Sequence, residues 1–245
     1  MTPALWISEA AEAFWRLAGT EEPFPRSLRA PIANALPVSL VQLPHLHITS
    51  AVSWLRRCGV VCTIGTGDRP LHAALVARYG QGVLFLDGAD ADAEQRFSLA
   101  HELAHYLRHY RQLRRRVEDR LGTASLEVLD GVRPASRTER VDALLAGVPI
   151  GYYVHLMQRD SDGSFPDART ATAEREADLL AYELLAPADP VSRQVAGVAF
   201  EQRRVAAADV LCRRFGFPEA SAAAYAGHLF PARSDSFLRR LSIVR

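Results

Sequence analysis

Apolar residues recur at helical spacing in several stretches of the chain, with polar residues on the opposite face. The first stretch covers residues 3–18, where the apolar stripe ends near Gly19. This pattern is typical of an amphipathic helix that packs on a core. Cap residues, alanine-rich composition and terminating glycines or prolines predict four further helices, at residues 49–58, 172–186, 191–215 and 219–228.

Short apolar runs without helical spacing predict strands between the first helices. Residues 60–64 form one such run, and residues 71–78 and 83–87 form two more. The last two runs flank the sequence Gly80-Gln81-Gly82, whose glycines favour a tight turn. We therefore expect a β-hairpin here, followed by another helix.

Two long segments lack a regular pattern. Residues 20–48 contain five prolines, a density that disfavours a long helix and predicts an extended segment wrapped over the surface. The stretch after the next predicted helix has no clear periodicity, and we expect an irregular insertion with one or two short elements there. The sequence thus predicts three regions: an N-terminal helix and proline-rich segment (1–48), a main domain (49–187) with an insertion (111–170), and a C-terminal helical region (188–245).

The helix after the hairpin is expected to run to about Tyr110, with Asp90 or Asp92 as its N-cap. It contains the sequence H-E-x-x-H, in which His101 and His105 are four residues apart. Helical residues at this spacing share a face, so both imidazoles can bind one ion.

Glu102 lies one step round the helix from His101, where its carboxylate can accept a proton from the attacking water. This arrangement is typical of a zinc hydrolase, and we expect one Zn²⁺ ion.

A hydrolytic zinc site usually takes three protein ligands, so a third must come from elsewhere. His109 is about 12 Å along the helix axis from His101, which is too far to close the site. Metzincins have a third histidine ten residues after the first, but Arg111 occupies that position. We therefore expect a ligand from another helix.

The predicted helix 172–186 offers two acids as this ligand. Glu174 is favoured because Asp178 follows it on the same face, where an acid can accept the free N–H of a ligand histidine. Glu176 points about 200° away from Glu174 and stays open as the alternative.

Peptide hydrolysis also requires a hydrogen-bond donor for the oxyanion that develops on the substrate carbonyl. Three side chains in the predicted insertion are candidates, namely Tyr152, Tyr153 and His155.

The overall composition adds little functional direction. A net charge of +1 gives no general attraction to nucleic acid or to an anionic membrane. The arginine-rich stretch 108–120 also contains acids, which favours a solvated helix face. Three cysteines without a disulfide framework, and the lack of a leader or membrane-spanning run, are expected of a cytoplasmic protein.

Two segments of the chain resemble the ImmA/IrrE family of metallo-endopeptidases. The sequence RFSLAHELAHY at residues 96–106 resembles the metal helix of that family. EREAD at residues 174–178, followed by LLAP at 184–187, resembles its second signature. With the hairpin, the resemblance covers roughly residues 50–110 and 170–187.

This resemblance implies an α+β fold of the minimal, gluzincin-like zincin type. Such a fold has a small antiparallel or mixed sheet packed on the motif helix, and we expect additional helices at both ends. The resemblance implies His101, His105 and Glu174 as zinc ligands and Glu102 as general base. It also implies a protein substrate, a helix-turn-helix repressor that is cut in stress response or mobile-element regulation.

Two other functions stay open. One is a regulatory or toxin–antitoxin-associated protein that binds a repressor and uses its metal mainly for structure. The other is a nucleic-acid-binding module that uses the arginine-rich stretch and the C-terminal helices, although direct nucleic-acid binding is not favoured. A membrane partner is not expected.

Overall fold

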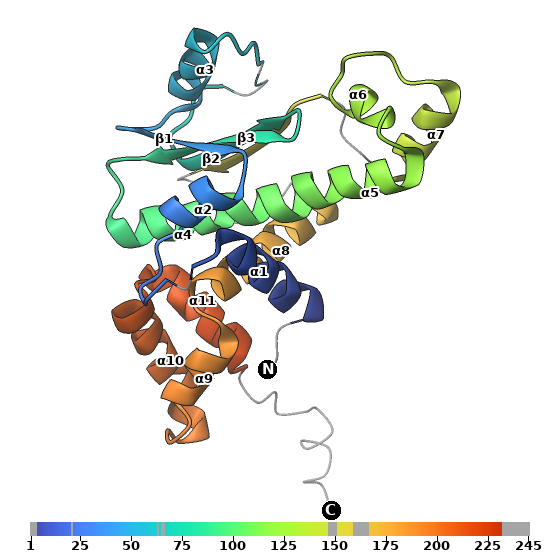
Figure 1. The fold of residues 1–245 in the computed structure, drawn as a ribbon. Helices are drawn as coiled ribbons and strands as arrows, with labels where there is room; N and C mark the ends of the chain where they lie inside the picture. The colour runs from blue at the N-terminus through green and yellow to red at the C-terminus, as the bar shows by residue number, and fades with distance from the viewer. Residues whose placement is uncertain are drawn as a thin grey trace, which may run out of the picture.

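The computed structural model describes residues 4–20, 22–62, 64, 67–146, 151–158 and 167–231. A four-stranded mixed sheet lies at the centre of one half of the molecule, and helices lie on both of its faces (Figure 1). Further helices from both ends of the chain pack beneath this sheet layer (Figure 1). The predicted α+β class is confirmed, and the arrangement is consistent with a zincin-like core.

The sheet has the strand order β1-β3-β2-β4. Its strands are β1 (Val38–Leu43), β2 (Leu71–Arg78), β3 (Gln81–Asp87) and β4 (Tyr153–Gln158). β1 runs parallel to β3, whereas β2 is antiparallel to both β3 and β4. Within the described residues, β1 and β4 are therefore the edge strands.

The predicted hairpin is confirmed, with a shorter turn than the glycine pattern indicated. Arg78 pairs with Gln81, so the turn consists of Tyr79 and Gly80 alone. Both have positive φ, 55° and 77°, as a two-residue turn of the I′ type requires. Gly82 already belongs to β3, where a Cβ atom would come within 3.1 Å of the Tyr106 ring.

The two faces of the sheet have different neighbours. Side chains alternate along each strand, so Ala73 and Leu75 of β2 join the core between the sheet and the motif helix. Ala74 and Val76 point the other way and pack with α3 (Ile48–Arg57). Figure 1 shows α3 above the sheet and α4 below it.

The motif helix is longer than predicted and changes its winding. It begins as α4 (Asp92–His105), continues as a π-helix, η1 (Tyr106–Arg111), and ends as α5 (Gln112–Leu121). Its N-cap is Ala91, without a side-chain cap, so the predicted aspartate cap is wrong.

The π-helix η1 contains two tyrosines, Tyr106 and Tyr110, that contact the hairpin turn. The hydroxyl of Tyr106 donates to the carbonyl of Gly80 at 2.7 Å. The backbone N–H of Gly80 in turn donates to the hydroxyl of Tyr110, also at 2.7 Å. These two bonds fix the hairpin to the end of the motif helix.

A second long helix, α8 (Ala168–Leu185), packs against α4. Asp167 caps it by accepting a hydrogen bond from the N–H of Thr170 at 2.7 Å. Ala177 and Ala181 are fully buried in its inner face, and such small side chains allow close helix packing. α1 (Leu5–Ala18) covers another side of α8.

The remaining helices are α2 (Arg29–Ala35), α6 (Ser125–Leu129), α7 (Arg137–Ala146), α9 (Ala188–Gln194), α10 (Phe200–Phe215) and α11 (Glu219–Leu229). The predicted helix 191–215 is wrong, because α9 and α10 are separate and Gly197 lies in the break. The predicted helix at 219–228 is confirmed.

Two further predictions need correction. The run 60–64 is not a strand in its described residues; Val60, Cys62 and Ile64 instead pack in the apolar cluster beneath α3. The proline-rich segment is more regular than expected, because the proline-free stretch between Pro37 and Pro44 forms strand β1. β1 takes the sheet edge beside β3.

Candidate metal centre

Four potential metal ligands from three elements converge between the sheet and the helices. His101 and His105 come from α4, His155 comes from β4, and Glu174 comes from α8. One ligand atom from each lies within 4.8 Å of the others. His101 and His105 are buried, with 3% and 1% of their surface exposed, whereas His155 and Glu174 are half-buried. We call these four residues the donor cluster.

The spacing within the donor cluster suits a small tetrahedral ion. The Nε2 atoms of His101 and His105 are 3.1 Å apart. Glu174 places Oε2 at 3.3 Å from His101 Nε2 and Oε1 at 3.6 Å from His105 Nε2. Bonds of about 2 Å in tetrahedral geometry separate ligand atoms by about 3.3 Å. Imidazole nitrogen and carboxylate oxygen are also ligand types that zinc commonly accepts.

Asp178 and Tyr153 contact the outer ring nitrogens of the two histidines of α4. Asp178 Oδ1 lies 2.9 Å from Nδ1 of His101. An acceptor there holds the proton on Nδ1 and leaves Nε2 free for an ion. The hydroxyl of Tyr153 lies 3.2 Å from Nδ1 of His105.

Glu102 lies beside the donor cluster and is fully buried. Both of its carboxylate oxygens are close to His155 Nδ1, at 2.9 and 3.0 Å. The other ring nitrogen of His155 is 2.8 Å from Oε1 of Glu174. His155 therefore lies between the two acids.

The electrostatics divide the histidines into two kinds. Burial alone lowers the pKa of His101, but hydrogen bonds with Asp178 and Glu174 outweigh it and raise this pKa to about 9. Burial also lowers the pKa of His155, but the negative charges of Glu102 and Glu174 outweigh it and raise this pKa to about 10. Burial and the charge of His155 lower the pKa of His105 well below its ordinary value. Burial raises the pKa of Glu174, but hydrogen bonds with the three histidines outweigh this effect and hold the pKa far below the usual range.

These pKa shifts predict that metal binding depends strongly on pH. A metal ion must displace the proton that metal-free His101 holds up to about pH 9. Raising the pH removes this competing proton, so we expect metal affinity to increase about tenfold per unit from pH 6 to pH 9 for one displaced proton. Competition with a chelator at several pH values measures this.

Asp178→Asn is the control for the pH dependence. It removes a carboxylate that raises the pKa of His101, so the steep part of the curve should move to lower pH. An affinity that stays constant between pH 6 and pH 9 would contradict the assignment.

The structure separates the two acids that compete as third ligand. Glu174 lies in the donor cluster. Glu176, two residues on, instead forms an ion pair with Arg108, with Oε2 at 2.8 Å from Nε.

The three predicted oxyanion donors lie on different faces of the sheet. Tyr153 and His155 face α4, because β4 pairs them with Ala77 and Leu75 on that face of β2. Tyr152 lies on the other face of the sheet, where its ring packs against the guanidinium of Arg78 at 4.5 Å. Tyr152 therefore points away from the donor cluster.

The sequence predicts His155 as a candidate oxyanion donor and not as a metal ligand, whereas the structure places it in the donor cluster. The signal was the short run of mostly apolar and aromatic residues at 152–157, which is typical of a strand. In a strand, His155 and Tyr153 lie on the same face. The stretch is short and lies in a segment of weak periodicity, so the sequence predicts an irregular insertion there.

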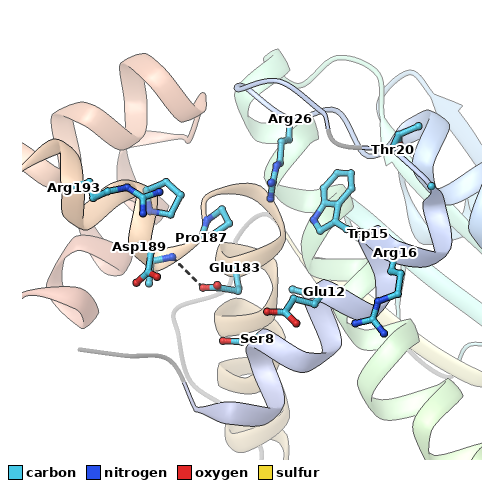
Figure 2. A pocket seen from close by; sticks show the side chains of 14 residues that line it. Ser8, Glu12, Trp15, Arg16, Thr20, Arg26, Glu183, Pro187, Asp189 and Arg193 are labelled. Atoms are coloured by element: carbon cyan, nitrogen blue, oxygen red, sulfur yellow. Dashed lines mark hydrogen bonds between the residues drawn. The ribbon is translucent and has the colours of Figure 1, made fainter.

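A separate cavity of about 740 Å³ lies between α1 and the connection from α8 to α9 (Figure 2). Acidic and basic side chains both line it, among them Glu12, Arg16 and Glu183. Burial raises the pKa of Glu183, whose carboxylate accepts a hydrogen bond from the N–H of Ala188 at 3.2 Å. No member of the donor cluster lines this cavity, so it is distinct from the metal centre.

Comparison with known proteins addresses the identity of this centre. Residues 61–126 match a peptidase family, Peptidase_M78, described as the IrrE N-terminal-like domain. The chain matches no curated protein and no solved structure. None of the helices in the described part of the chain is long and apolar enough to cross a membrane. The family match contains α4 with its H-E-x-x-H motif, and over residues 61–126 it confirms the resemblance to the ImmA/IrrE family of metallopeptidases.

Proposed function

We propose that this protein is a zinc-dependent endopeptidase with His101, His105 and Glu174 as the zinc ligands. The observation that carries the proposal is the spacing of 3.1–3.6 Å between their ligand atoms, with Glu102 beside them. A bound zinc ion would act as a Lewis acid and lower the pKa of a water molecule toward about 7.

Glu102 is the general base of the proposed reaction. It takes the proton of the attacking water and later transfers that proton to the leaving amine of the cleaved peptide. Its position supports this role, because its carboxylate is next to the donor cluster on the same helix but is not among the clustered ligand atoms.

His155 is the favoured donor for the oxyanion. Its ring lies against that of His105, with centroids 3.6 Å apart, and its nitrogens reach Glu102 and Glu174. Tyr153 is the alternative, and its hydroxyl contacts His105. Both ring nitrogens of His155 meet a carboxylate, so an N–H becomes available to the oxyanion of the substrate when one of these two contacts opens.

The edge strand β4 supports an extended peptide substrate. β4 pairs with β2 on one side, and among the described residues no strand covers its other side. An extended peptide can add to such an edge through backbone hydrogen bonds. The family resemblance suggests a cytoplasmic helix-turn-helix repressor as substrate, cut in stress response or in the regulation of a mobile element.

Metal analysis and a cleavage assay test this proposal together. Purified protein is analysed by elemental mass spectrometry and then incubated with a purified repressor encoded beside it in the genome. We expect one zinc ion per chain and defined repressor fragments, with cleavage lost in chelator and restored by zinc. Absence of zinc from both purified and reconstituted protein would overturn the proposal.

The same assay separates the other candidate functions. Repressor that is bound but stays intact would identify a binding protein with a structural metal. Salt-dependent binding to DNA without any cleavage would identify a nucleic-acid-binding module.

A further inference from the structure

On the side that points away from the donor cluster, His105 meets a fourth histidine, His109. His105 Nε2 faces the donor cluster, at 3.1 Å from His101 Nε2. Its other nitrogen, Nδ1, lies 3.1 Å from Nδ1 of His109, one helical turn further along. His109 is outside the donor cluster, so it is not a direct ligand candidate.

His109 is itself held from α8. Its Nε2 lies 3.3 Å from Oε2 of Glu176. Arg108 fixes Glu176 with two parallel hydrogen bonds, from Nε at 2.8 Å and from Nη2 at 2.9 Å. Arg108 is anchored in turn, because its guanidinium packs 4.1 Å from the centre of the Trp6 ring. A bidentate pair of this kind sets both position and orientation.

The contacts are consistent with one placement of protons when His105 binds a metal ion through Nε2. Its Nδ1 then carries the proton, so His109 can accept it only through an unprotonated Nδ1. A neutral His109 with a bare Nδ1 has its proton on Nε2, where it donates to Glu176. Each contact along the chain of groups therefore has one donor and one acceptor.

We infer that His109 is a positioning residue for the metal ligand His105, and that Glu176 and Arg108 hold His109 in the required tautomer. This inference rests on the proposed function in taking His105 as a metal ligand. Asp178 does for His101 directly what Glu176 does for His105 through His109. α8 thus presents Glu174 to the ion and supports both ligand histidines with its next two acids.

The inference explains why Glu176 is paired although it is not among the donor cluster. An acid that supports a ligand through another side chain must lie one layer further out. Partners of this kind typically change metal affinity by about 10–100-fold when they are removed.

The test compares zinc affinity of the full-length protein with that of two variants. His109→Leu removes the acceptor for His105, and we expect zinc affinity to fall by about 10–100-fold. His109→Asn places an amide oxygen near the position of Nδ1, so it should restore most of the affinity. Competition with a chelator measures both, and the absorption spectrum of Co²⁺-loaded protein should shift in the leucine variant and return toward wild type in the asparagine variant.

Two controls keep the comparison specific. His72→Leu replaces another half-buried histidine, whose Nδ1 lies 2.8 Å from Asp90, and should leave zinc affinity unchanged. Tyr153→Phe removes the other group near His105 Nδ1. A loss of affinity in Tyr153→Phe without a loss in His109→Leu would assign the positioning role to Tyr153 and overturn the inference.

The outcomes also distinguish the inference from the proposed function. Equal zinc affinity of wild type and His109→Leu overturns the inference and leaves the proposed function intact. An asparagine variant as weak as the leucine variant also overturns it. Failure of the wild type to bind zinc overturns both. Should His109→Leu not fold, Glu176→Ala gives the second measurement, because it removes the acceptor for His109 Nε2. A zinc affinity equal to wild type there would contradict the chain of contacts.

Discussion

Glu102→Gln is expected to reduce peptide cleavage by about 10²–10⁴-fold, the usual contribution of a general base. Glutamine has nearly the shape of glutamate, so the fully buried site should stay packed. Its amide oxygen can still accept a hydrogen bond from Nδ1 of His155, which now lies 2.9 Å from Glu102. The variant loses the ability to take a proton, and it also loses the negative charge that helps to raise the pKa of His155.

This variant should therefore keep its zinc content while its cleavage rate falls. Elemental analysis should find zinc as in wild type, while fragment formation, followed by mass spectrometry, becomes slow or undetectable. Glu94→Gln is the matched control, because Glu94 lies in the first turn of the same helix and outside the donor cluster. Cleavage by Glu102→Gln at the wild-type rate would remove Glu102 from the reaction.

Glu174→Ala is expected to weaken zinc binding by more than about 100-fold, beyond the usual effect of groups that only support a ligand. The carboxylate of Glu174 contacts all three histidines of the donor cluster. Its removal takes away one ligand and the negative charge that faces the imidazoles.

Glu176→Ala provides the comparison for Glu174→Ala. It leaves the donor cluster complete and removes only the support behind His109, so its loss of affinity should be about 10–100-fold. Chelator competition on both variants gives the order of the two effects. A larger loss in Glu176→Ala than in Glu174→Ala would show that the assignment of the two acids is reversed.

The regular elements near the motif were predictable because their patterns are local. The hairpin at 71–87 combines alternating or continuous apolar runs with a turn that only certain residues tolerate. The first half of the motif helix and the second helix are long runs of helix-favouring residues, and Pro187 marks the end of the latter. Such signals depend on neighbours in the sequence and need no knowledge of the fold.

The missed strands have a different origin, because they depend on pairing between distant segments. β1 and β4 are six-residue strands that gain their hydrogen bonds from β3 and β2. Nothing within either stretch states which strand it will join. The run 60–64 was apolar for another reason, namely packing beneath α3.

The candidate site shows the same division. The spacing of His101 and His105 on one helix follows from helical geometry, whereas the place of His155 depends on how β4 pairs with β2. The contact of His109 with Glu176 likewise depends on how α8 lies against the motif helix. The distance along the helix axis correctly predicted that His109 lies outside the donor cluster. It could not predict which residues of other elements His109 contacts.

The donor cluster also implies an order of events during synthesis of the chain. The family match ends at residue 126, and up to that point the growing polypeptide carries only His101 and His105 of the four donors. His155 and Glu174 emerge later, on β4 and α8. A nascent chain therefore presents two histidines on a helix before it presents a complete centre. We therefore expect tight capture of a metal ion only late in translation, after Glu174 has emerged and α8 can dock against α4.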